Sequence, residues 1–168
     1  MSWARPIERA LRMDQRSWER HANPWSAWTR VPILPLGVLA LLGREWIGLW
    51  CLLPLALLAA WTWWNPRAFA PPRSTRSWAS RAVMGERVWL RQGAVPIPAH
   101  HRWWANFLSL LPAPFLLPLA WGIVTLDWTL ALAGTALTLG AKMWFLDRMV
   151  WLFDDMARSH PEYAGWLR

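Results

Sequence analysis

The chain has 168 residues, of which 55% are hydrophobic and 17% charged, and its formal net charge is +8. Its apolar blocks leave no soluble segment longer than about 40 residues, which excludes a separate globular domain and predicts one domain over residues 1–168. The only cysteine, Cys51, lies inside an apolar block, so an intrachain disulfide is excluded.

Two long apolar blocks dominate the sequence. Residues 31–64 carry only Arg44 and Glu45 as charges, and residues 103–141 carry only Asp127. A hydrocarbon core roughly 30 Å thick is crossed by about 20 helical residues, so each block is too long for one span and suits two. The sequence therefore predicts an all-α integral membrane protein, in which four transmembrane helices form two hairpins that turn at these charges.

The N-terminal segment, residues 1–22, predicts a basic amphipathic helix. Four apolar residues recur near helical spacing, namely Trp3, Ile7, Leu11 and Trp18. Arginines lie between them. Such a helix is expected to lie flat in the headgroup layer, and the alternative is a surface helix packed on the protein. The segment is charged rather than a short basic start before an apolar core, so no cleaved signal peptide is expected.

Hairpin one is expected over residues 24–64, with spans at 24–43 and 46–64. Pro32 and Pro35 predict kinks, which are tolerated when neighbouring helices satisfy the freed backbone groups. A basic loop follows over residues 65–102. It is expected to hold a second interfacial helix that is capped by Ser74 or Ser77 and ends at Gly93.

The face of this loop helix is predicted from four residues at helical spacing: Trp78, Ala82, Gly85 and Trp89. Hairpin two is expected over residues 103–159, with one span at 103–126 and a last helix that begins at Trp128 and continues toward Ser159. That helix is too long to stay in lipid, so its second half is expected to leave the membrane. The 18 tryptophans gather near span ends, as in the aromatic belts of membrane proteins.

The positive charges are strongly asymmetric along the chain. Six Arg or Lys lie in residues 1–30, seven in residues 65–102 and four from Lys142 onward, while the two predicted turns hold only Arg44. Basic loops stay cytoplasmic, which predicts a multi-pass protein of the inner (plasma) membrane with both termini in the cytoplasm. The same charges would face the anionic leaflet, which favours the lipid bilayer and anionic headgroups over nucleic acid as partners.

Polar side chains also gather at the predicted cytoplasmic span ends. Ten of them form a predicted binding cluster: His21, Asn23, Asn65, Arg67, Glu86, Arg87, His100, His101, Asp147 and Arg148. Ionisable groups at that depth are costly and are often paired or functional, although charges also serve as ordinary anchors at helix ends. Pairing of Arg87 or Arg148 with Asp147 or Glu86 is expected, with His100 or His101 nearby.

A metal site at this face is a second hypothesis. Asp147, Asp154 and Asp155 share one face of the last helix, where they would meet an arginine or a cation. No histidines stand at i and i+4, and the adjacent His100 and His101 are expected to point apart. The candidate ligands are His100, His101, Asp147 and Asp154, with no metal or other cofactor identified.

Four motifs resemble a family of small uncharacterised multi-pass membrane proteins of prokaryotes. They are HANPWSAWTR from residue 21, WNPR from residue 64, GERVWL from residue 85 and DRMVWL from residue 147. The resemblance covers residues 21–156, and it implies a multi-pass membrane fold without implying an activity.

The function predicted from these features is binding at the cytoplasmic face, with anionic lipid headgroups or a membrane protein partner as the ligand. The alternative is a membrane-embedded enzyme that uses His21, His100 or His101 with an aspartate, with or without a metal. No glycine-rich phosphate loop, nucleophile elbow or H-E-x-x-H motif is present, so the sequence indicates no reaction type.

The charge asymmetry predicts the result of a topology experiment. Reporter fusions at residues 45 and 127 should read outside, and fusions at residues 20, 85 and 165 should read inside, because basic segments remain cytoplasmic. An outside signal at residue 85 would mean that one apolar block is re-entrant instead of forming two spans.

Overall fold

The computed structural model describes residues 15–168, and over this range the chain is helical without strands. The helices are α2 (Gln15–His21), α3 (Pro24–Trp28), α4 (Ile33–Leu42), α5 (Arg44–Ile47), the 3₁₀ helix η1 (Gly48–Cys51), α6 (Leu52–Ala68), α7 (Trp78–Leu90), α8 (Ala99–Leu110), α9 (Pro112–Thr125), α10 (Trp128–Ser159) and α11 (Pro161–Ala164). The all-helical expectation is confirmed. Of the predicted N-terminal helix, residues 1–14 lie outside the described range.

Within residues 15–168, four helical segments are long and apolar enough to cross a membrane. They are Pro24–Leu42, Arg44–Ala68, Ala99–Thr125 and Trp128–Ser159, which agrees with the predicted number of spans. The first segment is not one continuous helix, because α3 ends at Trp28 and Pro32 precedes α4. The uninterrupted last helix is confirmed, since α10 extends from Trp128 to Ser159.

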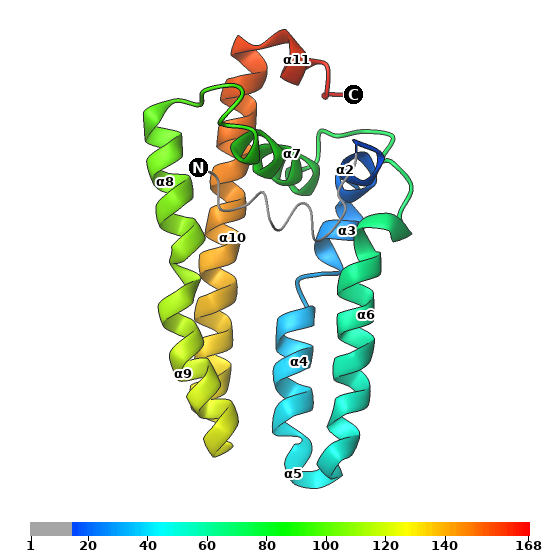
Figure 1. Cartoon of the computed structure of the whole chain (residues 1–168), viewed down its shortest axis with the longest axis vertical. Helices are drawn as coiled ribbons and strands as arrows, with labels where there is room; N and C mark the ends of the chain where they lie inside the picture. Colours follow the sequence, from blue (N-terminus) through cyan, green and yellow to red (C-terminus); the bar gives the residue numbers. More distant parts are fainter. Residues whose placement is uncertain (1–14) are drawn as a thin grey trace.

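The segments pack as two helix pairs (Figure 1). In the first helix pair, α4 lies beside α6, and α5 with η1 joins them at one end. In the second helix pair, α8 and α9 together form one segment, Ala99–Thr125, which lies along α10. We call the end that holds α5 and the α9–α10 turn the α5 end, and the opposite end the α7 end.

Arg44 connects the two helix pairs at the α5 end. Its guanidinium donates from Nη1 to the carbonyl oxygen of Leu41 at 3.1 Å, and from Nη2 to those of Ile123 at 2.6 Å and Val124 at 3.0 Å. The last carbonyls of a helix lack partners within the helix, and cationic side chains bind them favourably. A small apolar cluster of Val38, Leu42, Leu119 and Ala131 joins the same helices nearby.

The larger core lies at the α7 end, where α7 crosses α10 (Figure 1). Ser77 caps α7 by accepting a hydrogen bond from the backbone N–H of Ser80 at 3.1 Å, as one of the two predicted caps. The helix ends at Leu90, before Gly93. Eight of its residues are buried, including Ala82, Gly85 and Trp89 of the predicted face, so that much of this face packs inside the protein.

Gly85 sets the separation of α7 and α10. A Cβ atom there would overlap the carbonyl oxygen of Met149 and would lie 2.9 Å from the Met149 Cα atom. The two backbones therefore touch, in the manner of small-residue contacts between membrane helices. A side chain at this position is accommodated only if α7 moves away from α10.

Replacing Gly85 with alanine should destabilise the protein. Overpacking typically costs about 1–3 kcal/mol, and here the neighbour is backbone that cannot rotate away. The measurement is the midpoint of thermal unfolding of detergent-purified protein. Gly140→Ala is the matched control, because a Cβ atom there meets nothing within 4 Å, and it should leave the midpoint unchanged or raised. Equal midpoints for both variants would contradict the close packing.

Candidate functional site

Three polar contacts join α7 to α10 around Gly85. Glu86 forms an ion pair with Lys142 at 2.7 Å, and Arg81 forms one with Asp154 at 2.8 Å. The indole N–H of Trp78 donates to Asp147 Oδ1 at 3.1 Å. Glu86 and Asp147 were both predicted site residues, but each has a partner that the sequence analysis did not assign to it.

The expected pairing of Arg148 with these carboxylates is wrong. Arg148 instead lies over the rings of Trp104 and Trp151, at 5.1 and 4.7 Å from their centroids. Arg87 lies over Trp166 at 4.4 Å. A guanidinium is attracted to the face of an indole ring, and this tryptophan-rich chain offers such rings next to both arginines.

A cavity of about 130 Å³ lies between the two helix pairs, directly against α7. Its lining includes the apolar side chains of Val31, Leu139, Met143 and Leu146 together with three charged residues: Arg30, Glu86 and Lys142. We call it the Arg30–Lys142 cavity. A polar cavity holds one water in about 10–15 Å³, so this one admits a small polar group.

The three charges do not balance within the Arg30–Lys142 cavity. The half-buried Arg30 donates from Nε to the backbone carbonyl of Ser26 at 3.0 Å, and its Nη groups have no hydrogen-bond partner in the described chain. Lys142 is 47% exposed and its ammonium also lies 4.5 Å from the ring centroid of Phe145. Burial alone would raise the pKa of the Glu86 carboxyl, but the charge and hydrogen bond of Lys142, together with the charge of Arg30, hold it below its ordinary value. Glu86 is therefore ionised and cancels only one of the two cations.

A series of hydrogen bonds lies next to this cavity and begins at the buried His21. Ser26 Oγ donates to Asn65 Oδ1 at 2.8 Å, so its oxygen is left to accept from His21 Nδ1 at 3.2 Å. Asn65 Nδ2 donates to Thr29 Oγ1 at 2.8 Å, and Thr29 donates to the Trp25 carbonyl at 2.6 Å. The direction of these bonds places the proton of a neutral His21 on Nδ1. These hydrogen bonds join α2, α3 and α6.

His21 is held in its neutral form. Burial, followed by the nearby Arg30, lowers its pKa from 6.5 to about 3, with Lys142 acting in the same direction and Glu86 opposing. Asn23 follows His21 by two residues and Arg67 follows Asn65 by two residues, but both form separate hydrogen bonds. Asn23 donates to the Ala70 carbonyl at 2.9 Å, and Arg67 donates to the Trp63 carbonyl at 2.9 Å.

His100 and His101 lie on the first turn of α8, at a separate place on the molecule's α7 end. His101 Nε2 lies 2.8 Å from Asp155 Oδ2, and the His100 and His101 ring centroids are 4.2 Å apart. The expectation that these two side chains point apart is therefore wrong. Asp147 and Asp154 are engaged by Trp78 and Arg81, and the carboxylate near the histidines is Asp155.

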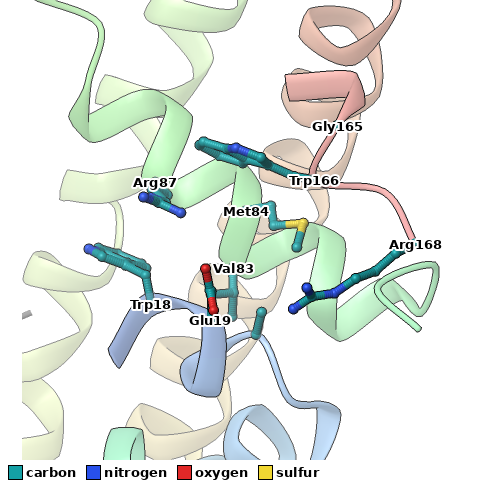
Figure 2. Close-up of a pocket in the computed structure, with 9 residues that line it drawn as sticks. Trp18, Glu19, Val83, Met84, Arg87, Gly165, Trp166 and Arg168 are labelled. Atoms are coloured by element: carbon teal, nitrogen blue, oxygen red, sulfur yellow. The ribbon is translucent and has the colours of Figure 1, made fainter. Parts of the chain in front are cut away.

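A second cavity of about 100 Å³ lies on the other side of α7, between α2 and the C-terminal segment (Figure 2). Val83 lines both cavities, whereas Arg87 and Met84 line only the second. Figure 2 shows Trp166 above Arg87, with Trp18 and Glu19 on the α2 side. The predicted residues Glu86 and Arg87 thus serve two different cavities, although they are adjacent in sequence.

A family model matches residues 4–166 and describes a family of unknown function, DUF6653. The chain belongs to this family. The resemblance to an uncharacterised family is confirmed, and DUF6653 membership assigns no activity. No curated protein matches the chain, and no solved structure matches it.

Four residues that line or support the Arg30–Lys142 cavity of this DUF6653 chain were not among the predicted site residues: Ser26, Thr29, Arg30 and Lys142. Lys142 carried a usable signal, because it is the only lysine and the only charge between Asp127 and Asp147. A lone ionisable residue in a predicted span indicates a partner or a site. Ser26, Thr29 and Arg30 stood within the HANPWSAWTR motif but had no recognisable role without their partners on α6 and α10.

The buried neutral His21 should make the protein sensitive to acid. The unfolded chain takes up a proton near pH 6.5 while the folded chain resists it down to about pH 3, so stability falls as the pH falls between these values. The loss is about 1.4 kcal/mol per pH unit, or about 2 kcal/mol from pH 6.5 to pH 5.

The measurement is the unfolding midpoint of purified protein at pH 7 and pH 5. His21→Gln should show a smaller acid-induced fall than the wild type, because the titrating group is gone. His160→Gln, at a part-exposed histidine, is the control and should behave as the wild type does. Identical pH dependence in all three proteins would show that His21 has the same pKa in the folded and unfolded states.

Proposed function

We propose that the protein binds the phosphodiester headgroup of one anionic phospholipid in the Arg30–Lys142 cavity, at the cytoplasmic side of the inner membrane. The observation that supports this function is the unbalanced cation. Arg30 and Lys142 come from different helix pairs to one cavity, and Glu86 neutralises only one of them. A phosphodiester carries a single negative charge, which would balance the other cation.

The depth of these cations in the predicted spans agrees with a headgroup ligand. Lys142 lies 14 residues after Trp128, which is about 21 Å along α10 from its start. In a hydrocarbon core roughly 30 Å thick, that position is within reach of the opposite headgroup layer for a lysine that extends toward the interface. Charges held at this depth are costly unless they are paired, and an anionic headgroup supplies the missing partner.

The walls of the cavity match the rest of a lipid molecule. Val31 lies on the first helix pair, while Leu139 and Met143 lie on α10, so acyl chains would meet apolar side chains on both sides. Binding sites of this type combine apolar walls with a few convergent polar groups. Many large apolar side chains of α6 and α9 are exposed in the isolated chain, as expected for surfaces in contact with lipid.

The proposed orientation depends on the distribution of arginine and lysine. All but one of the 18 basic residues lie in predicted cytoplasmic segments, and the exception, Arg44, belongs to the α5 end. Both termini would then be cytoplasmic, and the α7 end would face the anionic leaflet, where each basic residue near the surface contributes about 1 kcal/mol to membrane attraction.

Native mass spectrometry of the full-length protein tests this function directly. Phosphatidylglycerol should remain bound at one molecule per chain, whereas phosphatidylcholine should not. Arg30→Gln should weaken phosphatidylglycerol binding about 10- to 100-fold, because a hydrogen bond to a charged group contributes about 1.5–3 kcal/mol.

Arg102→Gln is the matched control, because it removes the same charge from an exposed position outside the cavity. It should bind phosphatidylglycerol as the wild type does. Equal weakening by both variants would reduce the effect to general surface charge, and retention of a co-purified protein in place of lipid would favour a membrane partner as the ligand.

A further inference from the structure

The geometry at the start of α8 points to a divalent transition-metal site made by His100, His101 and Asp155. This site is independent of the Arg30–Lys142 cavity, because it uses other residues on α8 and α10. The metal class is that of Zn²⁺, for which two imidazoles and one carboxylate are characteristic ligands. Nitrogen ligands argue against Mg²⁺ and Ca²⁺, which prefer oxygen.

The three side chains already converge on one point. One ligand atom from each of His100, His101 and Asp155 lies within 4.8 Å of the other two. Ligand atoms around a tetrahedral Zn²⁺ ion stand about 3.4 Å apart, given bond lengths near 2.1 Å. His101 Nε2 and Asp155 Oδ2, at 2.8 Å, need to separate only slightly, so the ion requires the approach of one further ligand.

His100 is the side chain that can supply this approach. It is exposed, whereas the His101 side chain is only 7% exposed and is fixed between α8 and α10. The His101–Asp155 contact would join the two helices without any help from His100. His100 has no hydrogen-bond partner in the described chain, yet its ring lies 4.2 Å from that of His101. Metal coordination gives both rings a shared function.

Two nearby features oppose a cation and set how tightly it is held. Arg158 contacts Asp155 Oδ1 at 3.1 Å, and the positive end of α8 lies beside the histidines. The Arg158 side chain is 78% exposed and sits on the carboxylate oxygen that the metal does not need. Its removal should therefore strengthen metal binding. With three protein ligands, one coordination position stays open to water or to a small ligand.

The test is a titration of full-length detergent-purified protein, stripped with a chelator and free of a histidine tag. Isothermal titration with Zn²⁺ should give one site per chain, and Co²⁺ should give the visible absorption of a tetrahedral complex. His100→Ala should weaken Zn²⁺ binding at least about 100-fold, since changes even to residues behind the ligands cost 10- to 100-fold. Its unfolding midpoint without metal should match the wild type, because His100 is exposed.

Two further variants separate a site from incidental binding. His160→Ala removes another histidine from the same end of the protein and should keep the wild-type affinity. Arg158→Gln should bind Zn²⁺ at least as tightly as the wild type. The proposal is overturned if the wild type binds no Zn²⁺, if His100→Ala binds it unchanged, or if His160→Ala loses as much affinity as His100→Ala.

Discussion

The contact between α7 and α10 at Gly85 is the constraint on which the polar chemistry depends. Because Gly85 has no side chain, the two backbones meet directly at Met149. That separation allows Glu86 to reach Lys142 and Trp78 to reach Asp147, on either side of the crossing. An interior packed at this density does not deform gradually, so a displacement of α7 would break these contacts together.

The helix α7 also connects the two helix pairs. Ser80 donates a hydrogen bond to the carbonyl oxygen of Ala22 at 2.7 Å, and Trp78 stacks on Trp28 with ring centroids 5.7 Å apart. These contacts hold the start of the first helix pair against α7, which itself packs on α10. The Arg30–Lys142 cavity exists because one helix touches both pairs, and the metal-site residues are independent of this connection.

Buried polar groups are few in the first helix pair, and those present are hydrogen-bonded one to the next. His21, Ser26, Asn65 and Thr29 each donate to the next acceptor, and the last bond ends on a backbone carbonyl. A buried polar group without a partner costs about 1–3 kcal/mol, which is large for a helix end at membrane depth. The same logic applies to Arg44, whose guanidinium satisfies carbonyls from both helix pairs at the α5 end.

Local patterns in the sequence determined the helical fold and the number of apolar helices. The apolar blocks, the cap at Ser77 and the absence of proline between Pro118 and Pro161 suffice to predict α7 and the long α10, because hydropathy and capping act within a few residues. The charge count and span length also predicted which polar residues share one end. These properties do not require knowledge of which helices touch.

Only the tertiary structure decided which polar residues meet. Glu86 could have met any arginine of the basic segments, and the crossing at Gly85 selected Lys142. His100 and His101 converge on Asp155 rather than on Asp147 or Asp154, because the rotation of α10 turns those two toward α7. Pairing depends on the rotation and separation of helices, which are set by side chains far apart in the sequence.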